Sequence, residues 1–157
     1  MKIIGRKKSE NVMKKIWIAF VATLTLLCGC QANENINASD YGEAIAKAQE
    51  IAVVSADTSE VLETITSEED IEHFVLSLEL DQWKLKALPD HAAEIGSFDL
   101  AQEQTIRLGQ TDSDGTLYEM ATITLYRGTY VGLEIGGLDM TFEVSEDTAD
   151  YLSGYFE

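Results

Sequence analysis

The sequence predicts an α+β fold with a single antiparallel sheet, a C-terminal β-meander, and two helices packed mainly on one face of that sheet. Three observations favour this class. The second half of the chain alternates apolar and polar residues and is interrupted by short glycine-containing turns, as in antiparallel hairpins. Two segments, 71–78 and 145–156, instead place apolar residues at helical spacing. The roughly 110 residues that carry these patterns are enough for one hydrophobic core and too few for two.

The folded part of the chain begins with short elements. Ala44–Gln49 is rich in helix-favouring residues and could form a helical turn, whereas Ile51–Ser55 and Val61–Thr66 are rich in β-branched residues and predict strands. A capping box at Thr66–Glu69 marks the start of a helix, with Ser67 as the alternative cap. The helix that follows presents one apolar face, formed by Ile71, Phe74, Val75 and Leu78.

Two further strands are predicted before the meander. Gln82–Leu88 alternates, with Trp83, Leu85 and Ala87 on one side, which is typical of a half-buried strand that ends before Pro89. In Phe98–Leu108, the apolar residues share one parity and the charged residues share the other.

The meander consists of three predicted strands, Leu117–Tyr126, Tyr130–Ile135 and Leu138–Val144. If Gly136-Gly137 is a two-residue hairpin, six apolar residues pair on one face: Ile135 with Leu138, Leu133 with Met140, and Val131 with Phe142.

The preceding turn is also constrained by register. A two-residue loop would mix the two faces, whereas a three-residue loop at Arg127–Thr129 pairs Leu125 with Val131, so we prefer the longer loop. Glu119 then shares the parity of the apolar Ile123. A bulge near residues 121–122 would turn Glu119 outward.

A final helix is predicted to start at Ser145. Its hydroxyl is a good N-cap, and Glu146 and Asp147 are favourably placed against the positive end of the helix dipole. Ala149, Leu152 and Phe156 supply its apolar stripe.

The N-terminal residues have a different character. Lys14 and Lys15 precede the apolar run Ile16–Leu27, whose length suits a signal peptide core and is short of the roughly 20 residues of a membrane span. Leu27-Cys28-Gly29-Cys30 follows and resembles a bacterial lipobox. The resemblance implies cleavage before Cys30, lipidation of that cysteine with palmitate-type acyl chains, and attachment to the outer face of the cell membrane. Met13 opens a complete signal sequence, so translation could start at Met13 or at Met1.

This interpretation divides the chain into a lipoprotein signal peptide (1–29), a lipidated cysteine with a flexible acidic tether (30–46), and one extracytoplasmic α+β domain (47–157). The signal holds six of the 11 basic residues and one of the 28 acidic residues, which leaves five and 27, a formal charge of −22. Such a surface repels nucleic acid and favours cationic partners. After cleavage and acylation no thiol remains for a disulfide, a metal or catalysis.

Several residues are candidates for function. Tyr126 and Tyr130 become cross-strand neighbours on the face away from the core and could form an aromatic platform for a partner. Lys84 and Lys86 hold two of the few positive charges, and we expect them to pair with neighbouring acids.

Other patterns are interpreted as structural, and we predict no metal site and no cofactor. Glu69 and His73 provide two ligands where a site needs more, and Asp90-His91 is expected on the surface of a loop. The segment 111–115 fails the EF-hand spacing and predicts a polar turn. No nucleophile elbow is present, so the sequence predicts a protein that is not an enzyme.

The segment Val61–Trp83, together with Thr122–Tyr126 and Met140–Phe142, resembles small lipoproteins of Gram-positive bacteria whose exported domain has no assigned function. The resemblance implies no functional residue, and the type of cell envelope stays open. The leading hypothesis is a non-catalytic, membrane-tethered module that binds a protein, a peptide or an envelope component. The alternatives are a carboxylate-dependent envelope hydrolase and a small accessory lipoprotein that binds a solute or a cation.

Overall fold

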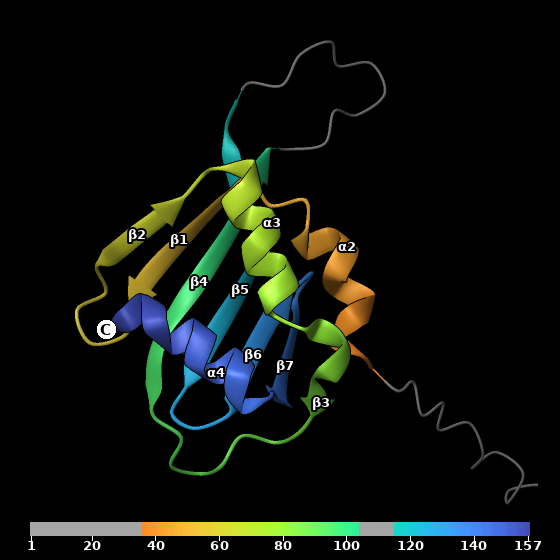
Figure 1. Ribbon diagram of the computed structural model, residues 1–157, viewed down its shortest axis with the longest axis vertical. Helices are drawn as coiled ribbons and strands as arrows, with labels where there is room; N and C mark the ends of the chain where they lie inside the picture. Colours follow the sequence, from red (N-terminus) through yellow and green to blue (C-terminus); the bar gives the residue numbers. More distant parts are fainter. Residues whose placement is uncertain (1–35, 104–114) are drawn as a thin grey trace, which may run out of the picture. The chain divides into compact units, whose positions relative to one another are not determined.

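The computed structural model describes residues 36–103 and 115–157, which belong to one compact unit. Its centre is an open sheet of seven antiparallel strands in the order β2-β1-β4-β5-β6-β7-β3 (Figure 1). The strands are β1 (Glu50–Ser55), β2 (Val61–Ile65), β3 (Lys84–Leu85), β4 (Glu94–Glu103), β5 (Leu117–Tyr126), β6 (Tyr130–Ile135) and β7 (Leu138–Glu143). The predicted α+β class with a single antiparallel sheet and a C-terminal meander is therefore confirmed.

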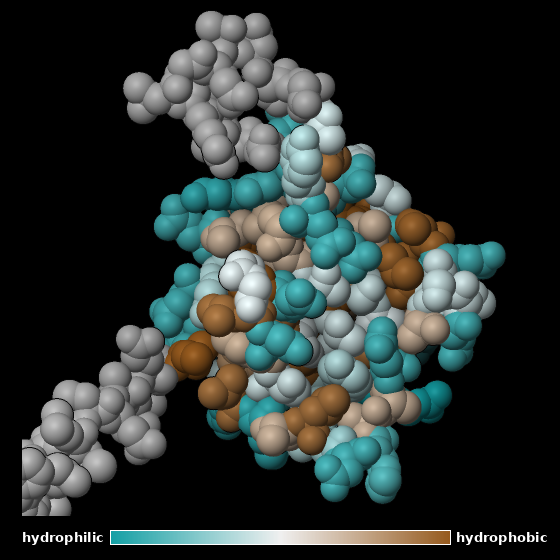
Figure 2. Space-filling model, turned by 180° about the vertical axis from the view of Figure 1, so that it is seen from behind, coloured by the Kyte–Doolittle hydropathy of each residue, from teal (hydrophilic) through white to brown (hydrophobic). Residues whose placement is uncertain are grey.

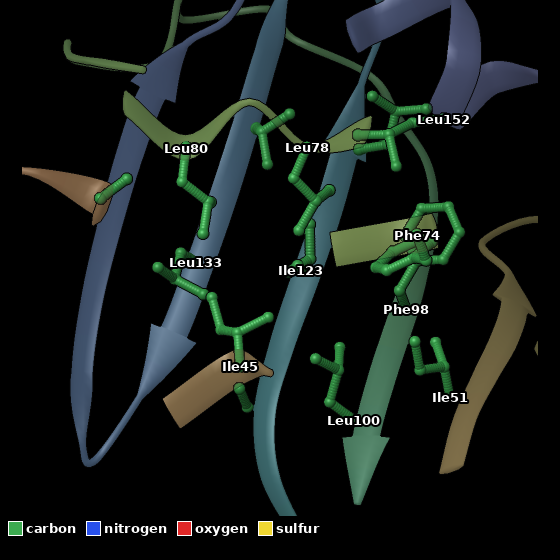
Figure 3. Close-up of a cluster of buried hydrophobic side chains, with 14 of the residues drawn as sticks. Ile45, Ile51, Phe74, Leu78, Leu80, Phe98, Leu100, Ile123, Leu133 and Leu152 are labelled. Carbon is green, nitrogen blue, oxygen red and sulfur yellow. The ribbon is translucent and has the colours of Figure 1, made fainter. Parts of the chain in front are cut away.

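The helices lie together on one side of this sheet (Figure 1). They are α2 (Gly42–Ile45), α3 (Glu68–Ser77) and α4 (Glu146–Ser153), with short 3-10 turns at Ala38–Tyr41, Leu80–Gln82 and Gly154–Phe156. The two longer helices were predicted. The helical turn considered at Ala44–Gln49 overlaps the short α2 only at Ala44 and Ile45. Their apolar side chains meet those of the sheet in one core (Figure 3): Ile45, Phe74, Leu78, Leu80 and Leu152 from the helical layer, and Ile51, Phe98, Leu100, Ile123 and Leu133 from the strands.

Both predicted hairpins have the expected register. Gly136 and Gly137 occupy the turn between β6 and β7 with φ of 60° and 80°, a conformation that glycine adopts without steric cost. The strands pair Ile135 with Leu138, Leu133 with Met140 and Val131 with Phe142. The three-residue loop at Arg127–Thr129 is also confirmed, because Leu125 lies opposite Val131.

The predicted bulge lies between β4 and β5. Leu100 is opposite Ala121, but the next residue, Ala101, is opposite Glu119, so β5 holds one extra residue, Met120. Because of this extra residue, Glu119 points away from the core. Its carboxylate accepts a hydrogen bond of 3.3 Å from the Thr122 hydroxyl at the surface. The bulge thus keeps an acidic residue out of the apolar layer without changing the register of Ile123 and Leu125.

The helix caps follow the sequence with one correction. Ser67, not Thr66, caps α3, and its hydroxyl accepts a hydrogen bond of 3.4 Å from the amide of Asp70. Thr66 and Ser67 both satisfy the spacing rule, and the helix starts at Glu68, one residue later than the favoured cap would set it. The prediction for the last helix is confirmed, because the Ser145 hydroxyl accepts a hydrogen bond of 3.1 Å from the Thr148 amide.

The predicted strand at Gln82–Leu88 is mostly wrong. Lys84 and Leu85 pair with β7 at the edge of the sheet, and the Lys86 amide donates one further backbone hydrogen bond of 2.9 Å to the Thr141 carbonyl. Gln82 belongs to a 3-10 turn. The cause is Trp83, whose buried indole nitrogen donates a hydrogen bond of 2.6 Å to the Leu78 carbonyl at the end of α3. This contact keeps the chain beside the helix at Trp83, so the ladder does not extend back to Gln82.

Two boundaries also differ from the prediction. Strand β4 begins at Glu94, four residues before Phe98, because pairing with β1 and β5 outweighs the weak local pattern; the remainder of Phe98–Leu108, from residue 104, lies outside the described residues. The folded unit begins at Ile36 instead of residue 47. Ala38 and Ile45 are fully buried in the core, although the polar residues around them resemble a tether.

Candidate binding face

One face of the sheet is covered by the helices, and the other face is open to solvent. Viewed from behind, this face shows hydrophilic residues mixed with residues of intermediate hydropathy, and hydrophobic groups lie toward both sides (Figure 2). Because successive side chains of a strand point to opposite faces, the outward residues of neighbouring strands line up in rows that cross the sheet. The register of β4, β5, β6 and β7 defines three such rows.

Of the first two rows, one consists of small residues and the other is mainly acidic. We call the first the threonine row; its members are successive partners on β4, β5, β6 and β7: Ser97, Thr124, Gly132 and Thr141. We call the next the acidic row; it contains Asp99, Thr122, Glu134 and Asp139 on the same four strands. The Asp99 carboxylate accepts a hydrogen bond of 3.1 Å from Ser97, which fixes one contact between the two rows.

The third row, the tyrosine row, lies on the other side of the threonine row. Its members are successive partners on β4, β5, β6, β7 and β3: Glu94, Tyr126, Tyr130, Glu143 and Lys84. The predicted pairing of Tyr126 with Tyr130, on the face opposite the core, is thus confirmed. At about 4.8 Å between strands, the row extends over roughly 19 Å.

Tyr130 is covered by a positive charge from its own chain. The Lys86 ammonium lies 5.6 Å from the centre of the Tyr130 ring and 2.6 Å from the Glu143 carboxylate. The hydrogen bond to Glu143 raises the pKa of Lys86. The expected pairing with a neighbouring acid is confirmed for Lys86, and this end of the row combines a ring, a cation and an anion.

Tyr126 has a different environment. A Cβ atom added to Gly132 would lie 3.4 Å from Tyr126 Cε2 and 3.7 Å from its hydroxyl, so the ring passes over the backbone of β6. Burial raises the pKa of Tyr126, and the negative charges of Glu94 and Asp139 raise it further. The charges that act on this ring are therefore negative.

Two acidic residues around Tyr126 were not predicted from the sequence. Glu94 lies in the part of β4 that was not predicted, and Asp139 acts on the ring from β7, two strands away. Thr124 and Gly132 were expected beside the two tyrosines, and the register places them in the neighbouring row.

The other candidates from the sequence are placed apart. Glu69 and His73 are exposed on α3, and Asp90-His91 is exposed in the loop that follows β3. Within residues 36–103 and 115–157, no three His, Cys, Asp or Glu residues are grouped so that they could hold a metal ion. The turn at 111–114 and the lipobox residues Leu27, Cys28, Gly29 and Cys30 lie outside the described residues.

A second feature, on the helical side, was not anticipated from the sequence. A hollow of about 780 Å³ separates the segment 46–49 from α3. Ile71, Val75 and Leu76 form its apolar wall, and Leu76 is 70% exposed. Glu68 and Glu72 also line it, but they lie one turn apart on the same helix and do not face each other across the space.

Comparisons do not assign this chain to a family: no protein-family model, curated protein or solved structure matches it. None of the helices found in the described ranges has both the length and the apolar character needed to cross a bilayer.

Proposed function

We propose that this protein is a lipoprotein on the outer face of the cell membrane, attached through acyl chains on Cys30, and that its folded domain is a non-catalytic binding module. The anchor is supported by the basic residues, the apolar run and the Leu27–Cys30 motif in their usual order. A diacylglyceryl group would supply two acyl chains, which is sufficient for stable attachment, whereas one chain binds only marginally.

The domain uses its open sheet face to bind a protein, a peptide or an envelope component. The observation that supports this role is the tyrosine row beside a row of small residues, on a face that the helices leave uncovered. Tyr126 and Tyr130 are half-buried, so each offers a held aromatic surface together with a polar hydroxyl. Tyrosine is enriched at protein interfaces for this reason, since it provides a large contact area at a low cost in conformational entropy.

The anchor is tested by growing cells with a radiolabelled or alkyne-modified palmitate and isolating the protein. The wild-type chain should carry the label, and Cys30→Ala should lose it. Cys28→Ala is the matched control, since it removes the neighbouring thiol but keeps a small residue at that position, and it should stay labelled. Equal labelling of both variants would exclude Cys30 as the attachment site.

The binding face is tested by placing a photo-crosslinking amino acid at Thr124, in the centre of the open face, and irradiating intact cells. The matched control carries the same group at Leu76, which is exposed on α3 on the opposite side of the sheet. We expect a defined adduct from position 124 that is absent from position 76. Adducts that form at position 76 and not at position 124 would place the interaction on the helical layer and refute this proposal.

A further inference from the structure

The two rings of the tyrosine row differ in their neighbours: a cation lies over Tyr130, and Tyr126 has acidic neighbours. At Tyr130 a set of three groups is complete: the ring, the Lys86 ammonium 5.6 Å from its centre, and the Glu143 carboxylate that holds that ammonium at 2.6 Å. The protein itself therefore shows which kind of group this face accepts, namely a primary ammonium seated between an aromatic ring and a carboxylate.

At Tyr126 the ring and the carboxylates are present, but no basic side chain of the described residues lies over the ring. Glu94 is the direct cross-strand neighbour of Tyr126, and Asp139 acts on it from β7. The Cε2 edge and the hydroxyl of the ring lie beside Gly132, and the side chain is partly exposed, so part of the ring is accessible to solvent and to a partner. Tyr126 therefore has the ring and the negative charge found at Tyr130, without the cation.

We propose that Tyr126, together with Glu94 and Asp139, receives a lysine or arginine side chain of a cationic peptide segment belonging to the partner. This inference rests on the proposed function, because it names the ligand chemistry of the same open face. A cation placed on the ring would gain the attraction of the π face and of Glu94, the direct cross-strand neighbour, and Asp139 would attract a second cation of the same segment.

The spacing of the acids favours a peptide over a single ion. Glu94 is on β4 and Asp139 is on β7, so three strand spacings of about 4.8 Å, or roughly 14 Å, separate their backbones at the least. Oxygen ligands of a metal ion must converge to about 2.0–2.6 Å from it, which these two residues do not do. The two acids also lie two rows apart, which adds four residues, or roughly 13 Å, along the strands, so their backbones are roughly 20 Å apart. An extended peptide advances about 3.3 Å per residue, so two cationic side chains about six residues apart would span this separation.

Charge complementarity identifies the same occupant. The described residues contain 24 acidic side chains and four basic ones, and two of the four, Lys47 and Lys86, are already paired with acids. A second copy of this chain would bring the same negative charge to the face, which opposes self-association through it. A positively charged segment is attracted to this face at long range and can then contact the Tyr126 ring.

The test uses the full chain in detergent and a fluorescent, acetylated and amidated peptide of four Lys-Gly repeats. Binding is measured by fluorescence anisotropy, and the same peptide with every lysine acetylated serves as the uncharged probe. We expect the peptide with free lysines to bind, with an affinity that decreases as the salt concentration rises. The peptide whose lysines are acetylated should not bind. Tyr126→Leu should weaken binding about five- to thirty-fold, and Tyr126→Phe, which keeps the ring, should retain most of it.

Tyr118→Leu is the matched control, since it makes the same change at an exposed tyrosine on the same strand, outside the three rows. It should bind as the wild type does. Glu94→Gln combined with Asp139→Asn alters only exposed side chains, so the fold should persist while binding weakens several-fold.

Equal affinity of the two leucine variants would mean that diffuse negative charge holds the peptide, and the inference would be wrong. It would also be wrong if the wild-type chain bound neither peptide or bound both equally. The crosslinking result at Thr124 separates the two proposals: an adduct there, combined with no role of Tyr126 in peptide binding, would refute the cationic ligand and leave the binding face in place.

Discussion

Replacing Gly96 with alanine should disrupt the packing of the C-terminus. Gly96 lies on β4, on the core side of the sheet, opposite Leu125. A Cβ atom at this position would lie well under 3.0 Å from the Phe156 ring and from the Val54 carbonyl oxygen. The ring belongs to the last turn of the chain and can move away, but the oxygen belongs to the backbone of β1 and cannot move without disturbing the strand pairing.

The expected cost combines three terms. Overpacking with a forced backbone shift costs about 1–3 kcal/mol. Expelling the half-buried Phe156 ring loses about 1–2 kcal/mol of apolar burial. Replacing glycine inside a strand returns about 0.5–1 kcal/mol, because alanine loses less backbone entropy on folding. The net destabilisation is about 1–4.5 kcal/mol, which for a domain of this size lowers Tm by roughly 4–18 °C.

The assay is urea or thermal unfolding followed by circular dichroism, with Gly132→Ala as the matched control. Gly132 is also inside a strand, but its added Cβ would meet Tyr126 and Thr124 at 3.4–3.7 Å, which is ordinary van der Waals contact. We expect this variant to lie within about 0.5 kcal/mol of the wild type. If Gly96→Ala were equally mild, the contact between Phe156 and the β4 backbone would not exist as described. The double variant with Phe156→Ala should be less than additive, because the ring is already displaced.

Three other perturbations test separate parts of the fold by the same unfolding assay. Burial raises the pKa of Tyr155 above its ordinary value of 10.0, so the unfolded chain loses this proton first and stability falls as pH rises above about 10. Tyr155→Phe should remove part of that fall, at most about 1 kcal/mol per pH unit for a half-buried group. The Glu79 carboxylate accepts hydrogen bonds from the Ser145 and Thr148 hydroxyls at the start of α4, so Glu79→Ala should cost about 1–2 kcal/mol of stability. Glu79→Gly should cost less, because φ is 49° at this position and glycine adopts this conformation without steric strain. Trp83→Phe leaves a carbonyl at the end of α3 without its buried donor and should cost about 1–3 kcal/mol; a cost near zero would exclude the hydrogen bond as the reason for the short β3.

The meander could be predicted because several local rules agree there. The glycines at 136 and 137 set the turn, the alternation sets the faces, and a one-residue slip would bury charged groups. The prediction failed where tertiary contacts oppose the local pattern. Trp83 has the correct parity for a strand, but its indole nitrogen needs a buried acceptor, and the nearest one lies at the end of a helix.

The candidate site was predictable only in part, for the same reason. Tyr126 and Tyr130 belong to one hairpin, so their proximity follows from the length of a single loop. Asp139 belongs to the predicted meander, so its place follows from the register of β6 and β7, whereas Glu94 comes from the start of β4, which was not predicted. The position of Lys86 over Tyr130 depends on the pairing of β3 with β7, which joins residues more than 50 positions apart.

The two faces of the sheet are coupled through the same alternation. The inward residues of β5, β6 and β7 fix the register, because any slip would place them in water. That register then determines which outward residues become neighbours, including Tyr126 with Glu94 and Tyr130 with Glu143. The outward side chains contribute little to the core, so they can change without loss of the fold. Substitutions in the tyrosine row should therefore alter partner choice at nearly constant stability, whereas substitutions of their inward neighbours should unfold the protein before they alter binding.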